Sequence, residues 1–180
     1  MDIKIFKDLM IQTGFLCMTC DGDIDDREVD TLLSICAKLP LFDNFDFQAE
    51  VNILIKKLNE QGKAFQKAYF DLLKKCSLTE DEELSIIDIA IRVIKADEII
   101  KYSEIKFFKN IRYRLKISDD RIVEHFPDFE QYLEEDIVTE SLLDRITNQY
   151  FCIAELPQFE LIPIDASLLS TKKTEEPNIA

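Results

Sequence analysis

Turn-forming residues are scarce in this chain, and their scarcity limits the folds that it can adopt. Only three glycines and five prolines occur in 180 residues. A fold built from many short strands needs a turn roughly every 10 residues, usually with glycine or proline in it. Hydrophobic residues make up 47% of the chain, which is enough to build a packed core. The sequence therefore predicts an all-α fold, a bundle of about seven helices.

Helical spacing of apolar residues and N-cap residues divide the chain into elements and domains. The predicted helices cover residues 3–19, 25–38, 43–61, 63–76, 79–95, 101–116 and 118–126. We expect a helical domain over 1–125, an acidic extension of mixed helix and extended segments over 126–166, and a disordered tail over 167–180.

Acidic residues concentrate in the C-terminal third of the chain. The net charge is −14, but residues 1–117 hold 21 acids and 18 bases, whereas residues 118–180 hold 15 acids and 4 bases. A protein that binds nucleic acid or an anionic membrane surface needs clustered Lys and Arg. The charge therefore argues against both kinds of partner.

The cysteines and the first residues indicate a cytoplasmic protein. The beginning of the sequence has no basic stretch followed by an apolar one, and no apolar run reaches the roughly 20 residues that a membrane helix needs. Five cysteines are then expected to be reduced thiols. Cys17 and Cys20 have the spacing of a redox pair or of half a zinc site, but they also end an apolar helix, where cysteine is commonly buried.

Two helix-to-helix turns in the sequence are related. The segments from Asp21 to Glu28 and from Asp97 to Glu104 align without gaps, and each has an Asp at the helix end, an Ile three residues on and a Glu seven residues on. We call them the first and second acidic corners. Each Ile is expected to anchor its turn in the core, and each Glu lies near a helix start, where the helix dipole favours an anion. The bundle is thus predicted to consist of two pseudo-repeated helix-turn-helix halves.

This duplicated pattern resembles the TerB family of tellurite-resistance proteins over roughly residues 1–125. The matching positions are Asp21, Gly22, Ile24 and Glu28, then Asp97, Ile100 and Glu104. The resemblance implies a compact helical bundle with an acidic surface site for a divalent cation, Ca²⁺ first among them. The metal ligands would be Asp21, Glu28, Asp97 and Glu104. It also implies a role in bacterial stress response, tellurite resistance or phage defence, with other proteins as partners, some in membrane-linked complexes.

The second corner departs from the family pattern at Glu98, where glycine is expected. A side chain in the left-handed conformation costs about 1 kcal/mol. We therefore expect the second turn to have a different shape, and the first corner to be the better candidate for a cation site.

Other interpretations of the same residues remain open. The acids could serve only to cap helices on a solvated surface. They could instead be the ligands of a metal-dependent hydrolase, although neither a nucleophile nor a glycine-rich loop accompanies His125. A calcium EF-hand fits poorly, since Asp26 and Leu32 stand where its loop has Gly and Glu. An interaction protein is favoured over an enzyme.

The predicted helix over 101–116 is rich in Lys and Arg and contains one acid, Glu104. Its bases are Lys101, Lys106, Lys109, Arg112, Arg114 and Lys116. We expect the acidic C-terminal third, residues 118–180, to dock against it.

Overall fold

The computed structural model describes residues 2–133 and 156–163, and in these ranges the chain contains helices and no strand. The elements are α1 (Ile3–Met18), α2 (Asp26–Ala37), the 3₁₀-helix η1 (Pro40–Phe42), α3 (Phe47–Gln61), α4 (Lys63–Lys75), α5 (Glu80–Ile94), α6 (Tyr102–Arg112), α7 (Asp119–His125) and the 3₁₀-helix η2 (Pro127–Tyr132). The prediction of an all-α bundle of about seven helices is confirmed.

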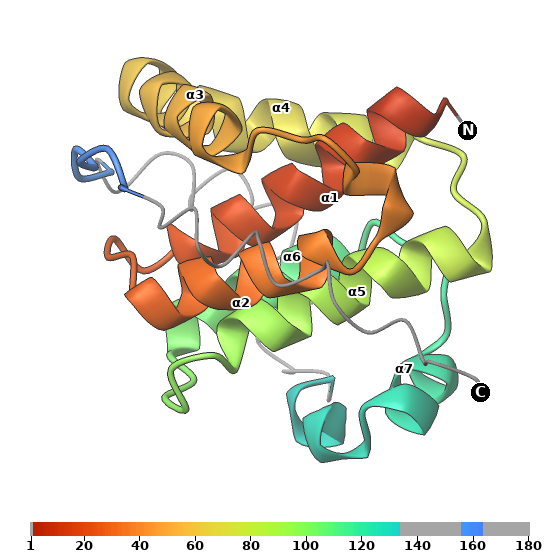
Figure 1. Cartoon of the computed structure of the whole chain (residues 1–180). Helices are drawn as coiled ribbons and strands as arrows, with labels where there is room; N and C mark the ends of the chain where they lie inside the picture. Colours follow the sequence, from red (N-terminus) through yellow and green to blue (C-terminus); the bar gives the residue numbers. More distant parts are fainter. Residues whose placement is uncertain (1, 134–155, 164–180) are drawn as a thin grey trace, which may run out of the picture.

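Helix α1 lies in the middle of the bundle (Figure 1). It packs most extensively against α5, and it also contacts α2, α3, α4 and α6. Helices α3 and α4 lie on one side of α1, with α2 and α5 on the other. This position explains why nine of the ten residues from Leu9 to Met18 are buried, including Phe15, which is fully buried. An apolar all-round helix belongs in a core rather than on a surface.

The two predicted hairpins are α1 with α2 and α5 with α6. Each helix of one hairpin contacts a helix of the other: α1 packs on α5, α2 on α5, and α1 on α6. The two helices that lead into the corners, α1 and α5, thus lie against each other. As a result, the first and second acidic corners emerge at the same end of the bundle.

Gly14 allows α1 and α2 to approach closely. A Cβ atom at this position would lie only 2.3 Å from Leu32 Cδ1 of α2 and 3.2 Å from Ile89 Cγ2 of α5. Glycine is costly in a helix interior, at about 1 kcal/mol relative to alanine. Here the cost is offset by packing, because Leu32 and Ile89 are both buried in the core.

Two helix ends differ from the prediction, each for a local reason. Helix α3 begins at Phe47 rather than near residue 43, since the Asp46 carboxylate accepts the Ala49 N–H at 2.9 Å and so caps the helix there. Helix α6 ends at Arg112 rather than near residue 116. The chain beyond it crosses to α5, where Glu83 Oε2 accepts the backbone N–H of residue 117 at 2.6 Å.

The core extends beyond the predicted 1–125 domain. Phe129 of η2 is fully buried, and its ring packs edge-on against Phe108 of α6 with the ring centroids 4.9 Å apart. The predicted tail over 167–180 lies outside the described residues. Within 2–133 and 156–163, no helix combines the length and the apolar character that crossing a membrane requires.

Candidate functional site

The two acidic corners have the same backbone shape. In the first, Asp21 Oδ1 accepts the N–H of Asp23 at 3.0 Å; in the second, Asp97 Oδ1 accepts the N–H of Ile99 at 2.9 Å. The residue after each Asp is left-handed, with φ of +94° at Gly22 and +65° at Glu98. The expectation that Glu98 would reshape the second turn is therefore wrong. The turn keeps its conformation and accepts a strain of about 1 kcal/mol.

Each corner leads into a helix whose start is capped by a buried glutamate. Glu28 Oε2 accepts the N–H of Asp25 at 3.0 Å, and Glu104 Oε2 accepts the N–H of Lys101 at 2.5 Å. In the first corner this bond is half of a capping box, since the Asp25 side chain also accepts a backbone N–H of α2. In the second corner only the bond back from Glu104 is present, because the Lys101 side chain has no acceptor. Capping glutamates are usually solvated, but Glu28 is only 5% exposed and Glu104 only 2% exposed. Burial therefore sets these two carboxyl groups apart from ordinary helix caps.

The corners face each other and exchange contacts. Arg27 of the first corner donates from Nη1 to the Asp97 carbonyl oxygen at 3.2 Å. In return, Lys101 of the second corner forms an ion pair with the Asp21 carboxylate, whose side chain is only 12% exposed. The structure thus brings the four acids predicted from the sequence, Asp21, Glu28, Asp97 and Glu104, into one cluster between α2 and α6.

Burial and mutual repulsion make the two glutamates hard to ionise. Burial is the main cause that raises the pKa of Glu28 to about 8 and that of Glu104 to about 7. The charges of Asp21 and Asp97 raise both pKa values further, and Glu104 adds to the effect on Glu28. The hydrogen bonds from the cap backbone act in the opposite direction but are outweighed. At pH 7 most of Glu28 and about half of Glu104 therefore remain protonated.

Lys101 is the cation that the cluster already contains. The Asp21 carboxylate raises the pKa of this lysine by accepting a hydrogen bond from it. The sequence showed Lys101 only as one base of a basic stretch. A signal was available, since Lys101 stands at the position that Asp25 occupies in the first corner. Charge reversal at one position of an otherwise acidic repeat indicates a lysine that faces the acids of the other copy.

The carboxylate oxygens of the cluster suit a hard cation, although Asp21 is paired with Lys101. Carboxylate oxygens are the ligands that Ca²⁺ and Mg²⁺ prefer. Among residues 2–133 and 156–163, no group of three or more His, Cys, Asp and Glu side chains is arranged to hold a metal ion. One oxygen of each buried glutamate accepts the N–H of its N-cap residue, and Lys101 neutralises Asp21. A bound cation would take the place of the lysine ammonium group and use the remaining oxygens.

Two buried thiols lie beside the cluster. Cys17 is fully buried and Cys20 is 7% exposed, and both are free thiols. Burial is the main cause that raises both pKa values, and the charges of Glu28 and Glu104 contribute. Redox and zinc chemistry require the thiolate. The surroundings of these cysteines favour the buried, structural interpretation of the Cys17–Cys20 spacing.

A short C-terminal segment, residues 156–163, reaches the first corner. We call it the strap. Its Pro157 packs over Gly22, where an added Cβ would lie 3.4 Å from the proline Cγ. Figure 1 shows the strap, in blue, beside α3. Part of the predicted acidic extension is therefore docked on the helical bundle.

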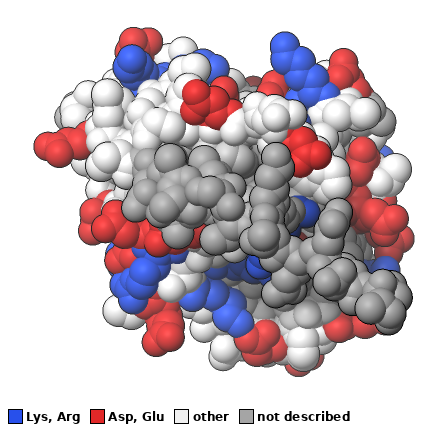
Figure 2. All heavy atoms as spheres, viewed as in Figure 1, with Lys and Arg blue, Asp and Glu red and all other residues white. Residues whose placement is uncertain are grey.

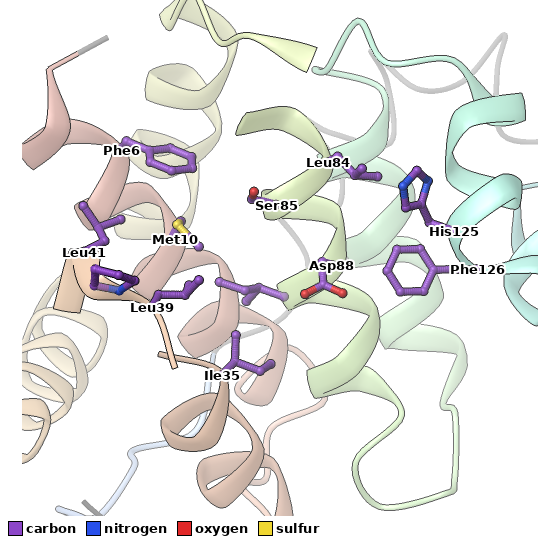
Figure 3. Close-up of a pocket in the computed structure, with 12 residues that line it drawn as sticks. Phe6, Met10, Ile35, Leu39, Leu41, Leu84, Ser85, Asp88, His125 and Phe126 are labelled. Atoms are coloured by element: carbon purple, nitrogen blue, oxygen red, sulfur yellow. The ribbon is translucent and has the colours of Figure 1, made fainter. Parts of the chain in front are cut away.

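An apolar pocket lies away from the acidic cluster. It has a volume of about 380 Å³ and is lined mainly by apolar side chains of α1, α2 and α5 and by Phe126 after α7 (Figure 3). Ser85, Asp88 and His125 also line it, but each is engaged within its own helix. Ser85 Oγ donates to the Asp81 carbonyl at 2.8 Å, Asp88 pairs with Arg92 at 2.6 Å, and His125 Nδ1 lies 2.9 Å from the Arg121 carbonyl.

That pocket therefore contains no activated nucleophile. The Ser85 hydroxyl donates to a backbone carbonyl, so it is not hydrogen-bonded to the histidine that would have to deprotonate it. The pocket gives no support to a hydrolase mechanism that uses His125.

Three basic side chains in α6 and just after it make contacts within the chain. Lys106 lies over the Tyr102 ring and Arg114 over the Phe70 ring, at 4.4 Å and 4.3 Å from the centroids. Arg112 pairs at 2.7 Å with Asp119, which belongs to the acidic third that was predicted to dock here.

On the face drawn in Figure 2, the described Lys and Arg side chains lie among Asp and Glu rather than forming a continuous basic surface. A surface of this kind does not favour nucleic acid.

Comparisons with known proteins return no match: no protein-family model, no curated protein and no solved structure is similar to the chain. The resemblance to the TerB family therefore rests on the residues of the two corners and stays a prediction.

Proposed function

We propose that this chain is a non-enzymatic, TerB-like interaction protein that binds a divalent cation between its two acidic corners. In this proposal it acts in the cytoplasm of a bacterium, in a stress, tellurite-resistance or phage-defence system. Its partners are other proteins, some of them in a membrane-linked complex. The cation ligands are Asp21, Glu28, Asp97 and Glu104, and Ca²⁺ is the first candidate.

One observation carries the proposal: two buried glutamates from related helix starts face each other across a cluster of four acids. Burying a carboxyl group that only caps a helix costs free energy without a compensating gain. Glu28 and Glu104 are nonetheless 5% and 2% exposed, and burial raises their pKa values to about 8 and about 7. Such a site gains more from a cation than a solvated acidic surface does, because desolvated charges interact more strongly.

Lys101 gives the site a way to exchange cations. Its ammonium group pairs with Asp21 but is 43% exposed, so it can move into solvent when a metal ion arrives. Metal binding would also release protons, since the glutamates must ionise to act as ligands. Binding is therefore expected to strengthen as the pH rises from about 6 to about 8, across the raised pKa values of the two glutamates.

The test is a calorimetric titration of the whole chain with Ca²⁺, Mg²⁺, Mn²⁺ and Zn²⁺. Repeating it at one pH in two buffers of different ionisation enthalpy measures the protons released. Lys101→Met is expected to strengthen binding by about tenfold, since it removes the competing charge. Lys106→Met is the matched control, because this lysine is on the same helix but lies over Tyr102. Asp21→Asn together with Asp97→Asn should abolish binding.

Stability provides a second measurement. A ligand that binds only the folded state adds about 2.7 kcal/mol to the free energy of unfolding at a hundredfold excess over its dissociation constant. The cation proposal fails if none of the four ions binds the wild-type chain or the Lys101→Met variant. It also fails if binding survives the double asparagine variant.

The interaction role is tested separately in the native cell. Proteins that co-purify with the tagged wild-type chain are compared with those captured by the double asparagine variant. We expect the variant to lose partners if the cation-loaded corners form the interaction surface. Identical partner sets would show that the corners are not that surface.

A further inference from the structure

Side chains of α3 hold the strap by hydrogen bonds to the backbone of the strap. Asn59 Nδ2 donates to the Phe159 carbonyl oxygen at 2.8 Å, and the Phe159 N–H donates to Asn59 Oδ1 at 2.9 Å. One side-chain amide thus pairs with both backbone groups of one residue, which an Asn can do because it carries a donor and an acceptor side by side. A contact of this kind holds a peptide by its main chain, whatever the side chain.

A second amide on the same helix face holds the other end of the strap. Gln48 Nε2 donates to the carbonyl oxygen of Ile162. Gln48 and Asn59 are separated by three turns of α3, about 16 Å along the axis. Three residues of extended chain, from Phe159 to Ile162, span at most about 11 Å, so the side chains of Gln48 and Asn59 make up the rest of the distance. The order of the two contacts shows that the strap runs antiparallel to α3. Asn52 lies between them at helical spacing, and its buried Oδ1 has no hydrogen-bond partner among the described residues.

The side chains of the strap are spaced to match this mode of docking. Leu156, Phe159 and Ile162 occur every third residue, and all three pack against the core while remaining partly exposed. Leu161 points away, with 53% of its surface exposed. Pro157 has no N–H that would need a partner, and it packs over Gly22. Proline-containing extended segments are a recurring form of peptide ligand, because little entropy is lost when they bind.

We propose that the face of α3 marked by Gln48, Asn52 and Asn59 is a peptide-docking site, and that the strap is its tethered occupant. The ligand class is an extended segment with a proline and with apolar residues three apart, as in residues 156–163. A partner protein that carries such a segment would bind by displacing the strap. The proposal does not depend on the cation site, because α3 contributes none of the four acids.

The contacts are few enough for the strap to be displaced. Its three inward side chains are only partly buried, whereas Phe129 of η2 is fully buried. Docking within one chain benefits from an effective concentration in the millimolar range. A segment with an intrinsic dissociation constant of about 0.1 mM would then be docked for about nine-tenths of the time. A free peptide would meet about tenfold competition from the strap.

The experiment uses the whole chain with the strap undocked by Phe159→Ser and Ile162→Ser. A fluorescent peptide with the sequence of residues 156–163 is titrated into the wild-type chain and into this double variant, and binding is followed by anisotropy. We expect the peptide to bind the double variant about tenfold more tightly than the wild type. A peptide with the same two serine changes is the control ligand.

Asn59→Ala, added to the double variant, is expected to abolish peptide binding. Lys57→Ala is its control, since this residue is exposed and lies on the opposite face of the same helix. Circular dichroism and thermal melts establish that each variant is folded. Three results would each overturn the proposal: no saturable binding to the double variant, equal affinity for wild type and double variant, or binding that Asn59→Ala leaves unchanged.

Discussion

Replacing Glu28 with Gln is expected to stabilise the protein at alkaline pH and to change little near pH 5. The amide keeps an oxygen that accepts the Asp25 N–H, so the capping box is retained. The substitution removes only the ionisable carboxyl group of residue 28. Burial raises the pKa of Glu28 from 4.5 to about 8 in the folded state. Between these values the unfolded chain has released the proton while the folded chain holds it, so the free energy of unfolding falls as the pH rises.

The size of the effect follows from the two pKa values. Each pH unit over which one proton separates the two states contributes about 1.36 kcal/mol. For Glu28 alone, the loss of wild-type stability between about pH 5 and about pH 8.5 comes to about 4 kcal/mol as an upper value. The pKa of Glu104 is also raised, and the charges of Asp21 and Asp97 contribute to both shifts. We therefore expect Glu28→Gln to gain roughly 2–4 kcal/mol over the wild type across this range.

The assay is urea unfolding followed by circular dichroism, at constant ionic strength and with EDTA present. Wild type and variant are measured at several pH values between about 5 and about 8.5. Glu82→Gln is the matched control, because Glu82 occupies the same capping-box position at the start of α5 but is less buried than Glu28. It measures what the change from Glu to Gln does to a capping box at a less buried position. If the difference between Glu28→Gln and wild type does not grow with pH, the assignment of Glu28 as a strained, buried acid is refuted.

Three further substitutions test the packing of the bundle. Gly14→Ala should destabilise the chain by about 1–3 kcal/mol in urea unfolding, since the new methyl group would collide with Leu32 Cδ1, and an unchanged midpoint would contradict the close approach of α1 and α2. Glu98→Gly should raise the free energy of unfolding by up to about 1 kcal/mol in thermal melts, because it relieves a φ of +65°, and a loss of stability would argue against that conformation. Tyr69→Phe should cost about 1 kcal/mol, because it removes the buried 2.7 Å hydrogen bond between the Tyr69 and Thr13 hydroxyls, and unchanged urea unfolding would show that the bond is not formed.

Most helix positions could be predicted, because helix starts and stops depend on nearby residues. The capping box of Thr79 with Glu82 and that of Asp25 with Glu28 are interactions over three residues, and both are confirmed. The end of α6 could not be predicted in the same way. It depends on Glu83, which is more than 30 residues away and accepts the N–H groups of the chain after the helix.

The local features of the candidate site could likewise be predicted from the sequence. The repeat of an Asp and a Glu in each corner was visible in the sequence, and the Asx turns and capping hydrogen bonds formed by these residues are local. The prediction for the second turn was wrong because it considered only the low preference of a Glu residue for a positive φ. The strain at this position is small compared with the packing that holds both ends of the turn.

The amino-acid sequence alone therefore determined the all-α class, the approximate helix positions and the repeated Asp and Glu of the two acidic corners. All of these depend on periodicity and on hydrogen bonds between residues a few positions apart. Only the tertiary structure decided that the corners face each other, that Lys101 pairs with Asp21 across 80 positions, and that the strap lies on α3 across 100 positions. Contacts between distant residues depend on how amphipathic helices pack, and many pairings are compatible with the same local pattern.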